Sequence, residues 1–279
     1  MTNSEMQTDA AMKQAVQWLR EADGLLITAG AGMGVDSGLP DFRGAEGFWR
    51  AYPSLKADGI QFEDIANPVA FRHDSVLAWG FYGHRLDLYR STTPHAGFGI
   101  LRKWAEQMRH GAFVFTSNVD GHFSKADFVD NRIAECHGSI HRLQCIDRCT
   151  ETLWPADAVQ PEIDEKRCRL LSPVPTCPNC GAVARPNILM FGDWDWVDSN
   201  ASRQQARLEQ WLSGVQKVVV EELGAGRAIP TVRNLSVRNG PRIVRINPRE
   251  FGIDPRKGVG IALAALDALT RLDTLLSEV

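Results

Sequence analysis

Several features that would place this 279-residue chain in a well-defined class are missing from its sequence. No apolar run approaches the roughly 18 residues that a membrane-spanning helix needs. The formal net charge is -3 and the pI about 6.2, so the composition gives no support for a nucleic-acid-binding surface. Residues 1–11 are polar and lack the pattern of a secretion signal. We therefore expect a cytoplasmic protein whose partners include neither nucleic acid nor a membrane.

The usual dinucleotide-binding fingerprint, G-x-G-x-x-G, is also incomplete. Gly30 and Gly32 fill its first two positions after the apolar run 25–28, but Val35 stands at the third. No clear acidic residue ends a second strand, and a charged and aromatic loop follows at 40–44 instead. Glycines after a strand still let the backbone approach a phosphate closely. This loop therefore predicts a nucleotide site, but not an ordinary hydride-transferring dehydrogenase.

Strand-like and helical segments alternate along most of the chain. The apolar spacing predicts, in order, helix 10–21, strand 25–28, helix 95–108, strand 113–115, helix 201–212, strands 217–220 and 242–246, and helix 260–276. Residues 48–89 are helical but interrupted, and α/β signals resume at 187–191 after a gap. This alternation predicts an α/β fold, a Rossmann-like doubly wound parallel sheet with helices on both faces.

Four of the six cysteines form two close pairs. Three residues separate Cys145 from Cys149, and two separate Cys177 from Cys180. Each pair can bind one side of a tetrahedral ion, and four thiolates leave no position for a catalytic water. The pattern predicts a structural zinc site, and the alternative is a set of reduced thiols without metal. Cys168, between the pairs, is either a competing ligand or a solvent-exposed side chain.

Two segments that break the alternation predict a second, smaller domain. Residues 48–89 form a helical insertion, and residues 144–183 carry cysteines, prolines and charges in place of periodic apolar residues. We assign both to the smaller domain, the second as its zinc-binding module. The remaining segments, 1–47, 90–143 and 184–279, form the Rossmann-like domain.

Polar side chains suited to catalysis follow the predicted strand 113–115. Asn118 and Asp120 come after it, at the edge where open α/β sheets bind ligands. His137 lies just ahead of the cysteine module, and an imidazole can act as a general base near neutral pH. A histidine before a glycine is by itself more often a loop residue. His137 therefore gains significance only where the fold brings it to Asn118 and Asp120.

Taken in order, these motifs resemble the sirtuin family of NAD-dependent protein deacylases, in its zinc-containing, bacterial type. Four blocks carry the resemblance: Gly30-Ala31-Gly32 through Phe42-Arg43-Gly44, then Thr116-Ser117-Asn118-Val119-Asp120, then His137-Gly138-Ser139, then the cysteine pairs. Segments 185–193 and 246–247 look like the family's peptide-pairing and adenosine-contacting segments. The resemblance covers the chain from about residue 25 to its end.

The resemblance implies a consumed NAD and a set of site residues. It implies an NAD site made of Gly30, Ala31, Gly32, Asp41, Phe42, Arg43, Ser117, Asn118, Asp120, Gly224, Ala225, Gly226 and Asn247. It implies catalysis by His137, Asn118 and Asp120, with His137 as the base, and an acyl-lysine peptide contacted by Tyr82, Arg85, Ile188 and Phe191. The metal would be Zn²⁺, held by Cys145, Cys149, Cys177 and Cys180. The products would be free lysine, nicotinamide and O-acyl-ADP-ribose.

A further segment resembles that of sirtuins that remove succinyl and malonyl groups. Those members bind the acyl carboxylate with a tyrosine and with an arginine three positions later, and Tyr82 and Arg85 have that spacing. On a helix the two side chains share a face, and a guanidinium is well suited to a carboxylate. The alternative is a packed tyrosine and a solvated arginine.

Three positions depart from the family's pattern. Ser117 replaces the usual glutamine, His122-Phe123 replaces Leu-His, and Gly224-Ala225-Gly226 replaces Gly-Thr-Ser after Glu221 and Glu222. Hydroxyls that bind phosphate and ribose are therefore missing, although backbone N–H groups can replace them. Two alternatives to a deacylase follow. One is an NAD glycohydrolase or ADP-ribosyltransferase using the same site, and the other is a module that senses NAD without catalysis.

Overall fold

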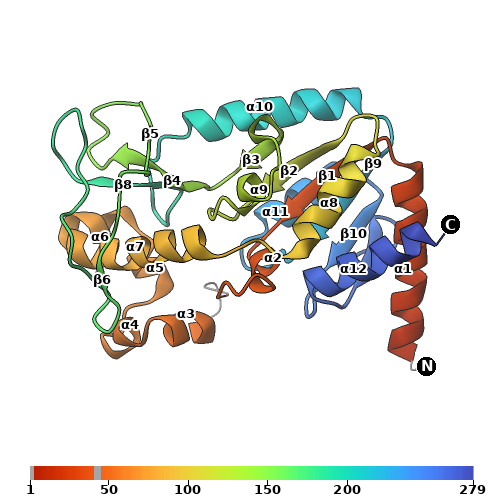
Figure 1. Ribbon diagram of the computed structural model, residues 1–279, viewed down its shortest axis with the longest axis horizontal. Coiled ribbons are helices and arrows are strands. Elements are labelled where there is room, and N and C mark those ends of the chain that lie inside the picture. The colour runs from red at the N-terminus through yellow and green to blue at the C-terminus, as the bar shows by residue number, and fades with distance from the viewer. Residues whose placement is uncertain (1–2, 41–44, 279) are drawn as a thin grey trace.

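The computed structural model describes residues 3–40 and 45–278, and a six-stranded parallel sheet forms its larger part (Figure 1). Its strands are β1 (Gly24–Ala29), β2 (Ala112–Thr116), β3 (Ile133–Glu135), β9 (Val218–Leu223), β10 (Ile243–Ile246) and β11 (Gly258–Ile261). They lie in the order β11-β10-β9-β1-β2-β3. The chain extends the sheet from β1 in one direction and then returns to extend it from β9 in the other. This arrangement confirms the predicted doubly wound, Rossmann-like fold.

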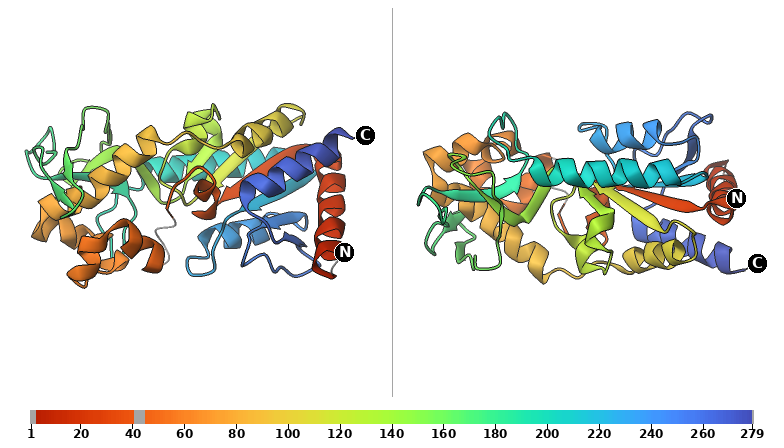
Figure 2. Two further views of the ribbon diagram at one scale, coloured as in Figure 1. Left: turned by 60° about the horizontal axis from the view of Figure 1, so that its bottom comes forward. Right: turned by 90° about the horizontal axis from the view of Figure 1, so that it is seen from above.

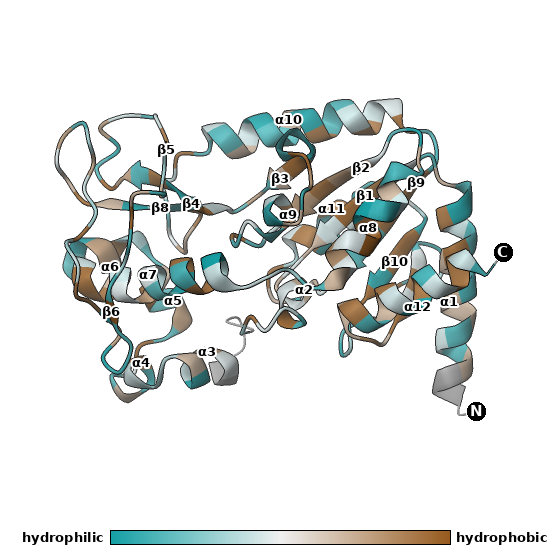
Figure 3. Ribbon diagram, viewed as in Figure 1, coloured by the Kyte–Doolittle hydropathy of each residue, from teal (hydrophilic) through white to brown (hydrophobic). Residues whose placement is uncertain are grey.

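Helices cover both faces of this sheet (Figure 2). One face carries α1 (Asn3–Glu21), α8 (Ala96–Glu106) and α12 (Ala265–Ser277), and the other carries α10 (Ser199–Gly214) and α11 (Thr231–Arg238). Leu25 and Ile27 pack toward the first layer, and Leu26 packs toward the second. Because both faces of β1 are buried, its sequence is continuously apolar rather than alternating. Figure 3 shows hydrophobic residues gathered in the strands, whereas α10 above them is largely hydrophilic.

Within the described residues, the smaller part combines four short helices and one long helix with a second sheet. The helices are α3 (Ala45–Ala51), α4 (Pro53–Ala57), α5 (Phe62–Ile65), α6 (Pro68–His73) and α7 (Ser75–Ser91). The antiparallel sheet has the order β5-β4-β8, from β4 (Gly138–Cys145), β5 (Trp154–Pro155) and β8 (Ala184–Ile188). A two-stranded hairpin, β6 (Ile163–Asp164) and β7 (Arg169–Leu170), lies beside α7. One apolar cluster joins these helices to the sheet, and the Trp79 indole N–H donates to the Ala184 carbonyl at 2.8 Å.

The remaining short elements follow strands β1 and β2 of the large sheet. They are α2 (Gly32–Val35), α9 (His122–Lys125) and a 3₁₀ turn, η1 (Asp130–Arg132). None of the described helices is long and apolar enough to cross a membrane.

The structure departs from the predicted elements in several places, and strand β3 was not predicted. The predicted helix 260–276 begins only at Ala265, because residues 258–261 form edge strand β11. A side chain at Gly258 would meet the Ile243 carbonyl oxygen at 2.0 Å, so this strand pairing requires glycine there. Helix α11 was not predicted. The signal at 187–191 overlaps strand β8, which pairs antiparallel with β4 and therefore lies outside the parallel sheet. Strand β8 and most of β4 lie in segments that were assigned above to the Rossmann-like domain. The predicted boundaries between the two domains stay a prediction.

Candidate functional site

The carboxyl ends of β1 and β9 lie side by side, at the point where the strand order reverses. The loops that follow them touch: Gly30 N–H donates to the Leu223 carbonyl at 2.9 Å and Gly32 N–H to that of Gly224 at 3.0 Å. Gly224 has φ +59°, and a Cβ there would lie 2.4 Å from the Gly32 backbone. Glycine is therefore required by the packing of the two loops against each other, besides the predicted approach of a phosphate.

A cavity of about 260 Å³ opens at this edge, and its polar wall comes from three separate segments. Ala31 belongs to the glycine loop, Asn118 and Asp120 follow β2, and His137 precedes β4. The Asn118 amide nitrogen donates to the Gly30 carbonyl at 2.9 Å and so ties the first two segments together. The fold thus brings the predicted catalytic residues to one cavity, and Ser117 lines it as well.

Helix α7 supplies the opposite end of the cavity through Tyr82, Arg85 and Tyr89. Arg85 donates from Nε and Nη2 to the Tyr89 hydroxyl oxygen at 3.0 and 2.6 Å, and its guanidinium lies 5.8 Å from the Tyr82 ring centroid. Arg85 is 8% exposed, so the alternative of a solvated arginine does not hold. Burial raises the pKa of Tyr82 to about 12, which keeps its hydroxyl protonated and able to donate.

The end of β8 and the residues after it form another wall, which includes Ile188 and Phe191. Leu189 N–H donates to the His137 carbonyl at 2.9 Å, so this wall is attached directly to the histidine segment. The fully buried ion pair between Arg185 and Asp193, at 2.7 Å, holds the following turn. Phe191 is 37% exposed and therefore lies partly open to solvent.

Other predicted NAD contacts lie at the same sheet edge but do not line the cavity: Gly30, Gly32, Gly224, Ala225, Gly226 and Asn247. Asn247 instead organises two loops. Its amide nitrogen donates to the Ala225 carbonyl at 3.2 Å, and its oxygen accepts from the backbone N–H groups of Arg249 and Glu250. The predicted contacts Asp41, Phe42 and Arg43 lie outside the described residues.

Two histidines that were not assigned a role hold the Asp120 turn. His141 Nε2 donates to the Asp120 carbonyl at 2.9 Å, and the Asp120 carboxylate accepts from the backbone N–H of His122 at 2.9 Å. Burial lowers the pKa of both imidazoles, which favours their neutral forms. The second contact is an Asx turn, a pattern that aspartate commonly forms with the residue two positions on.

Several further cavity residues were not predicted: Leu39, Pro40, Phe62, Ala66, Tyr89, Val119, Leu189, Met190 and Ile229. Tyr89 had a usable signal, because it lies one helical turn after Arg85 on the same face of α7. The apolar residues come from loops and short helices, and nothing in their spacing distinguishes a cavity wall from core.

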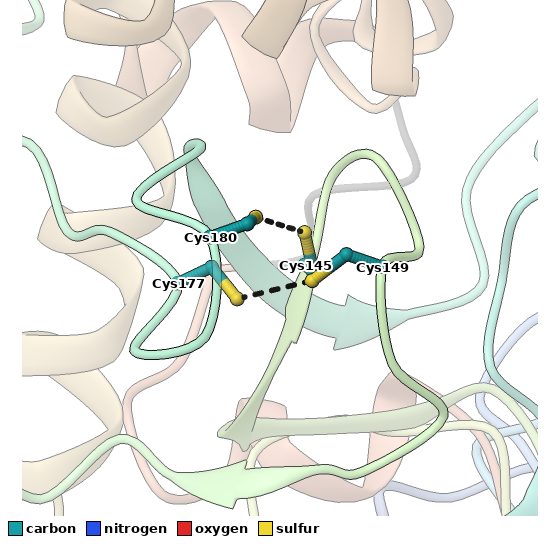
Figure 4. A group of neighbouring side chains, drawn as sticks. All are labelled: Cys145, Cys149, Cys177 and Cys180. Carbon is teal, nitrogen blue, oxygen red and sulfur yellow. Dashed lines mark hydrogen bonds between the residues drawn. The ribbon is translucent and has the colours of Figure 1, made fainter.

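The four paired cysteines converge at the end of β4 (Figure 4). Their sulfur atoms all lie within 4.8 Å of one another, and the pairs Cys145–Cys180 and Cys149–Cys177 are each 3.6 Å apart. Four thiolates bound to one zinc lie about 3.8 Å apart, so the cluster fits the ion. Cys168 is not in the cluster and is 1% exposed, so neither alternative stated for it is correct.

A family model described as the Sir2 family matches residues 30–210. The NAD-dependent protein deacylase of Aquifex aeolicus is 27% identical over 229 residues, which cover 82% of this chain and 85% of the relative. The protein of the same name from Thermococcus kodakarensis is 28% identical over 264 residues, covering 92% of this chain and 93% of the relative.

Solved structures agree with the fold. A Sir2 homologue in complex with NAD matches with a TM-score of 0.69 at 22% identity, covering 95% of this chain and 93% of that chain. Sir2Tm bound to a propionylated peptide matches with a TM-score of 0.63 at 19% identity, covering 95% and 98%. The matched family model spans most of the chain, including the glycine loop, the segments of Asn118, Asp120 and His137, and the cysteine pairs. The chain therefore belongs to the Sir2 family.

Proposed function

We propose that the chain is an NAD-dependent protein-lysine deacylase that transfers the acyl group to ADP-ribose. The observation that carries the proposal is the convergence of Ala31, Asn118, Asp120 and His137 on one cavity at the switch point of the sheet. Relatives named NAD-dependent protein deacylase match 82% and 92% of this chain. The substrate is an acyl-lysine side chain of a protein or peptide, and we propose a cytoplasmic setting.

The residues at the cavity divide the chemistry between them. Asn118, held by the Gly30 carbonyl, orients the ribose of NAD so that the acyl oxygen can displace nicotinamide. Asp120, fixed by two hydrogen bonds in its turn, lies where the departing nicotinamide is bound. His137 removes a proton from a ribose hydroxyl, whose oxygen then attacks the acyl carbon. The lysine amine leaves, and one water molecule completes the formation of O-acyl-ADP-ribose. The zinc-binding cysteines take part in no step and stabilise the smaller part of the fold.

His137→Ala tests these roles. With NAD and an acetyl-lysine peptide, the loss of the general base should lower turnover by about 10²- to 10⁴-fold. Affinity for ADP-ribose, measured by calorimetry, should change little. His73→Ala is the matched control, because His73 is exposed on α6 and lies away from the cavity.

The outcomes separate the competing functions. Full deacylation by His137→Ala would remove this residue from the mechanism. Nicotinamide release by the wild type without any peptide would instead favour the hypothesis of an NAD glycohydrolase or ADP-ribosyltransferase. Binding of ADP-ribose with no product from any acyl peptide would identify a sensing module.

We also propose that the deacylase prefers acyl groups that end in a carboxylate. Arg85 brings a positive charge to the cavity wall, and Tyr82 brings a protonated hydroxyl beside it. Arg85→Met should lower kcat/KM for succinyl-lysine peptide by about 10- to 100-fold, the value of one to two charge-assisted hydrogen bonds, and should spare acetyl-lysine peptide. Arg85→Lys keeps the charge but not the paired donors, so its loss should be intermediate. Equal losses for both peptides would show that Arg85 only packs.

A further inference from the structure

A second cavity, of about 490 Å³, lies between α11, β10 and the loop after β10. It shares no lining residue with the active-site cavity. Its walls include the four cationic residues Arg227, Arg233, Arg245 and Lys257, together with Val237, Gly252, Ile253 and Asp254. The cavity is therefore strongly basic.

Carboxylates neutralise only part of this charge. Glu222 binds Arg245 through both of its oxygens, and Asp254 pairs with Arg256 at 2.7 Å. Glu250 lies 3.7 Å from Arg233 and is the third acid. Counted together with Arg256, which does not line the cavity, five cations are balanced by three carboxylates.

The two remaining cations are Arg227 and Lys257. Within residues 3–40 and 45–278, neither side chain forms an ion pair with a carboxylate, although the charge of Lys257 helps to lower the pKa of Asp254. Both residues are exposed and line the cavity. The pKa of Arg233 is lowered by burial and then by the nearby charge of Arg245, which agrees with a local excess of positive charge. An anion bound here would relieve that repulsion.

The cavity adjoins the segment that the family resemblance relates to adenosine. The Ala225 carbonyl accepts from Arg233 Nε and Nη2 at 3.1 and 2.8 Å, and the same oxygen accepts from Asn247 at 3.2 Å. Arg233 also donates to the Glu250 carbonyl at 2.6 Å, one residue beyond the Arg249 backbone that Asn247 holds. Asn247 and the cavity residue Arg233 therefore bind the same carbonyl group, that of Ala225.

We propose that this basic cavity binds a phosphate group, and that the 2′-phosphate of an adenosine ribose is its source. A phosphate monoester carries about −1.5 to −2 charge at pH 7, which matches the two cations that lack a carboxylate partner. Dinucleotide-binding folds use an arginine near the ribose in the same way when the nucleotide is 2′-phosphorylated. The inference rests on the proposed function only in placing NAD at this edge, and it extends the co-substrate class to NADP. Free phosphate has the same chemistry and is the other source to distinguish.

Calorimetric titrations with ADP-ribose, 2′-phospho-ADP-ribose and inorganic phosphate test the proposal on the full chain. The double variant Arg227→Gln/Lys257→Gln should weaken binding of 2′-phospho-ADP-ribose about three- to tenfold and leave ADP-ribose unchanged. The matched control is Arg203→Gln/Arg238→Gln, which removes the same charge from exposed positions on α10 and α11 outside both cavities. The control variant should bind all three ligands as the wild type does.

Each outcome decides the question. If only inorganic phosphate loses affinity in the double variant, the site binds free phosphate and the nucleotide source is wrong. If neither 2′-phospho-ADP-ribose nor inorganic phosphate binds Arg227→Gln/Lys257→Gln more weakly than the wild type, the proposed phosphate site is overturned. If ADP-ribose fails to bind the wild type, the proposed function fails, whereas the inorganic phosphate titration still tests the cavity.

Discussion

The four-cysteine cluster and the carboxyl edge of the large sheet fix their geometry by opposite means. Between the two cysteine pairs in the sequence, strands β5, β6 and β7 are two residues long, and the four paired cysteine side chains converge within 4.8 Å. At the edge, the loops after β1 and β9 pack backbone against backbone, because Gly30, Gly32 and Gly224 have no side chains. The first region is made of side chains that can hold an ion, whereas the second requires that its glycines have no side chains. The two should therefore respond differently to chelators and to the addition of one methyl group.

The largest expected effect is the loss of the cluster. Cys177→Ser should abolish zinc binding, because the oxygen of serine is a poor ligand in a four-thiolate site, and should lower the midpoint of thermal unfolding. Metal content measured by mass spectrometry, alongside the unfolding curve, checks this. Cys168→Ser is the control: it also changes a buried cysteine, but one outside the cluster, and should keep one zinc per chain. A full metal content in Cys177→Ser would exclude that ligand.

A single methyl group should test the sheet edge. Gly224→Ala places a Cβ 2.4 Å from the Gly32 backbone and forces an alanine to φ +59°. We expect it to lower the free energy of unfolding by about 3 to 5 kcal/mol and to weaken ADP-ribose binding, with zinc content unchanged. Urea unfolding measures the first effect. Gly226→Ala is the stability control, because its Cβ would meet nothing closer than Glu250 at 3.7 Å. Equal stability of the two variants would contradict the proposed packing.

These two regions also differ in how far the sequence predicts them. The type and spacing of Cys145, Cys149, Cys177 and Cys180 specify a metal site before any fold is known. The contact between Gly32 and Gly224 joins residues that are far apart in the chain. The sequence shows that both are glycines, but it does not show that a side chain on either one would clash with the backbone of the other. The same limit explains the wrong sheet for 187–191, since a short apolar run is compatible with either sheet.

Local chemistry misled the prediction for Cys168. Arg167 and Arg169 flank Cys168 in the sequence and favour solvent exposure. In the structure, however, Cys168 has φ +52°, and its carbonyl oxygen would lie 2.0 Å from a Cβ at Gly80. The hairpin of β6 and β7 packs onto Gly80 of helix α7 and so buries Cys168, although both of its sequence neighbours are charged. By contrast, Asn118, Asp120 and His137 meet at one cavity as the order of motifs indicated, because parallel strands end at a common edge.

Two adjacent glutamates of β9, Glu221 and Glu222, are both buried but have different surroundings. Glu222 pairs with Arg245, whereas neither carboxylate oxygen of Glu221 has a hydrogen-bond partner in the described part of the chain. The register neighbours of Glu221, Ile27 and Val244, belong to the apolar core under α1, α8 and α12. Burial therefore raises the pKa of Glu221 well above its ordinary value of 4.5.

Glu221→Gln should have the smallest effect and a distinctive pH dependence. The folded chain keeps the Glu221 proton above pH 4.5, whereas the unfolded chain releases it, so the stability of the wild type falls as pH rises toward the raised pKa. The neutral amide removes this dependence. Near pH 5 the two proteins should unfold at similar urea concentrations, and at pH 7 the variant should be more stable by about 1 to 3 kcal/mol. Glu222→Gln, which breaks the pair with Arg245, should destabilise at both pH values. A constant difference between Glu221→Gln and the wild type from pH 5 to 8 would show that Glu221 is not protonated in the core.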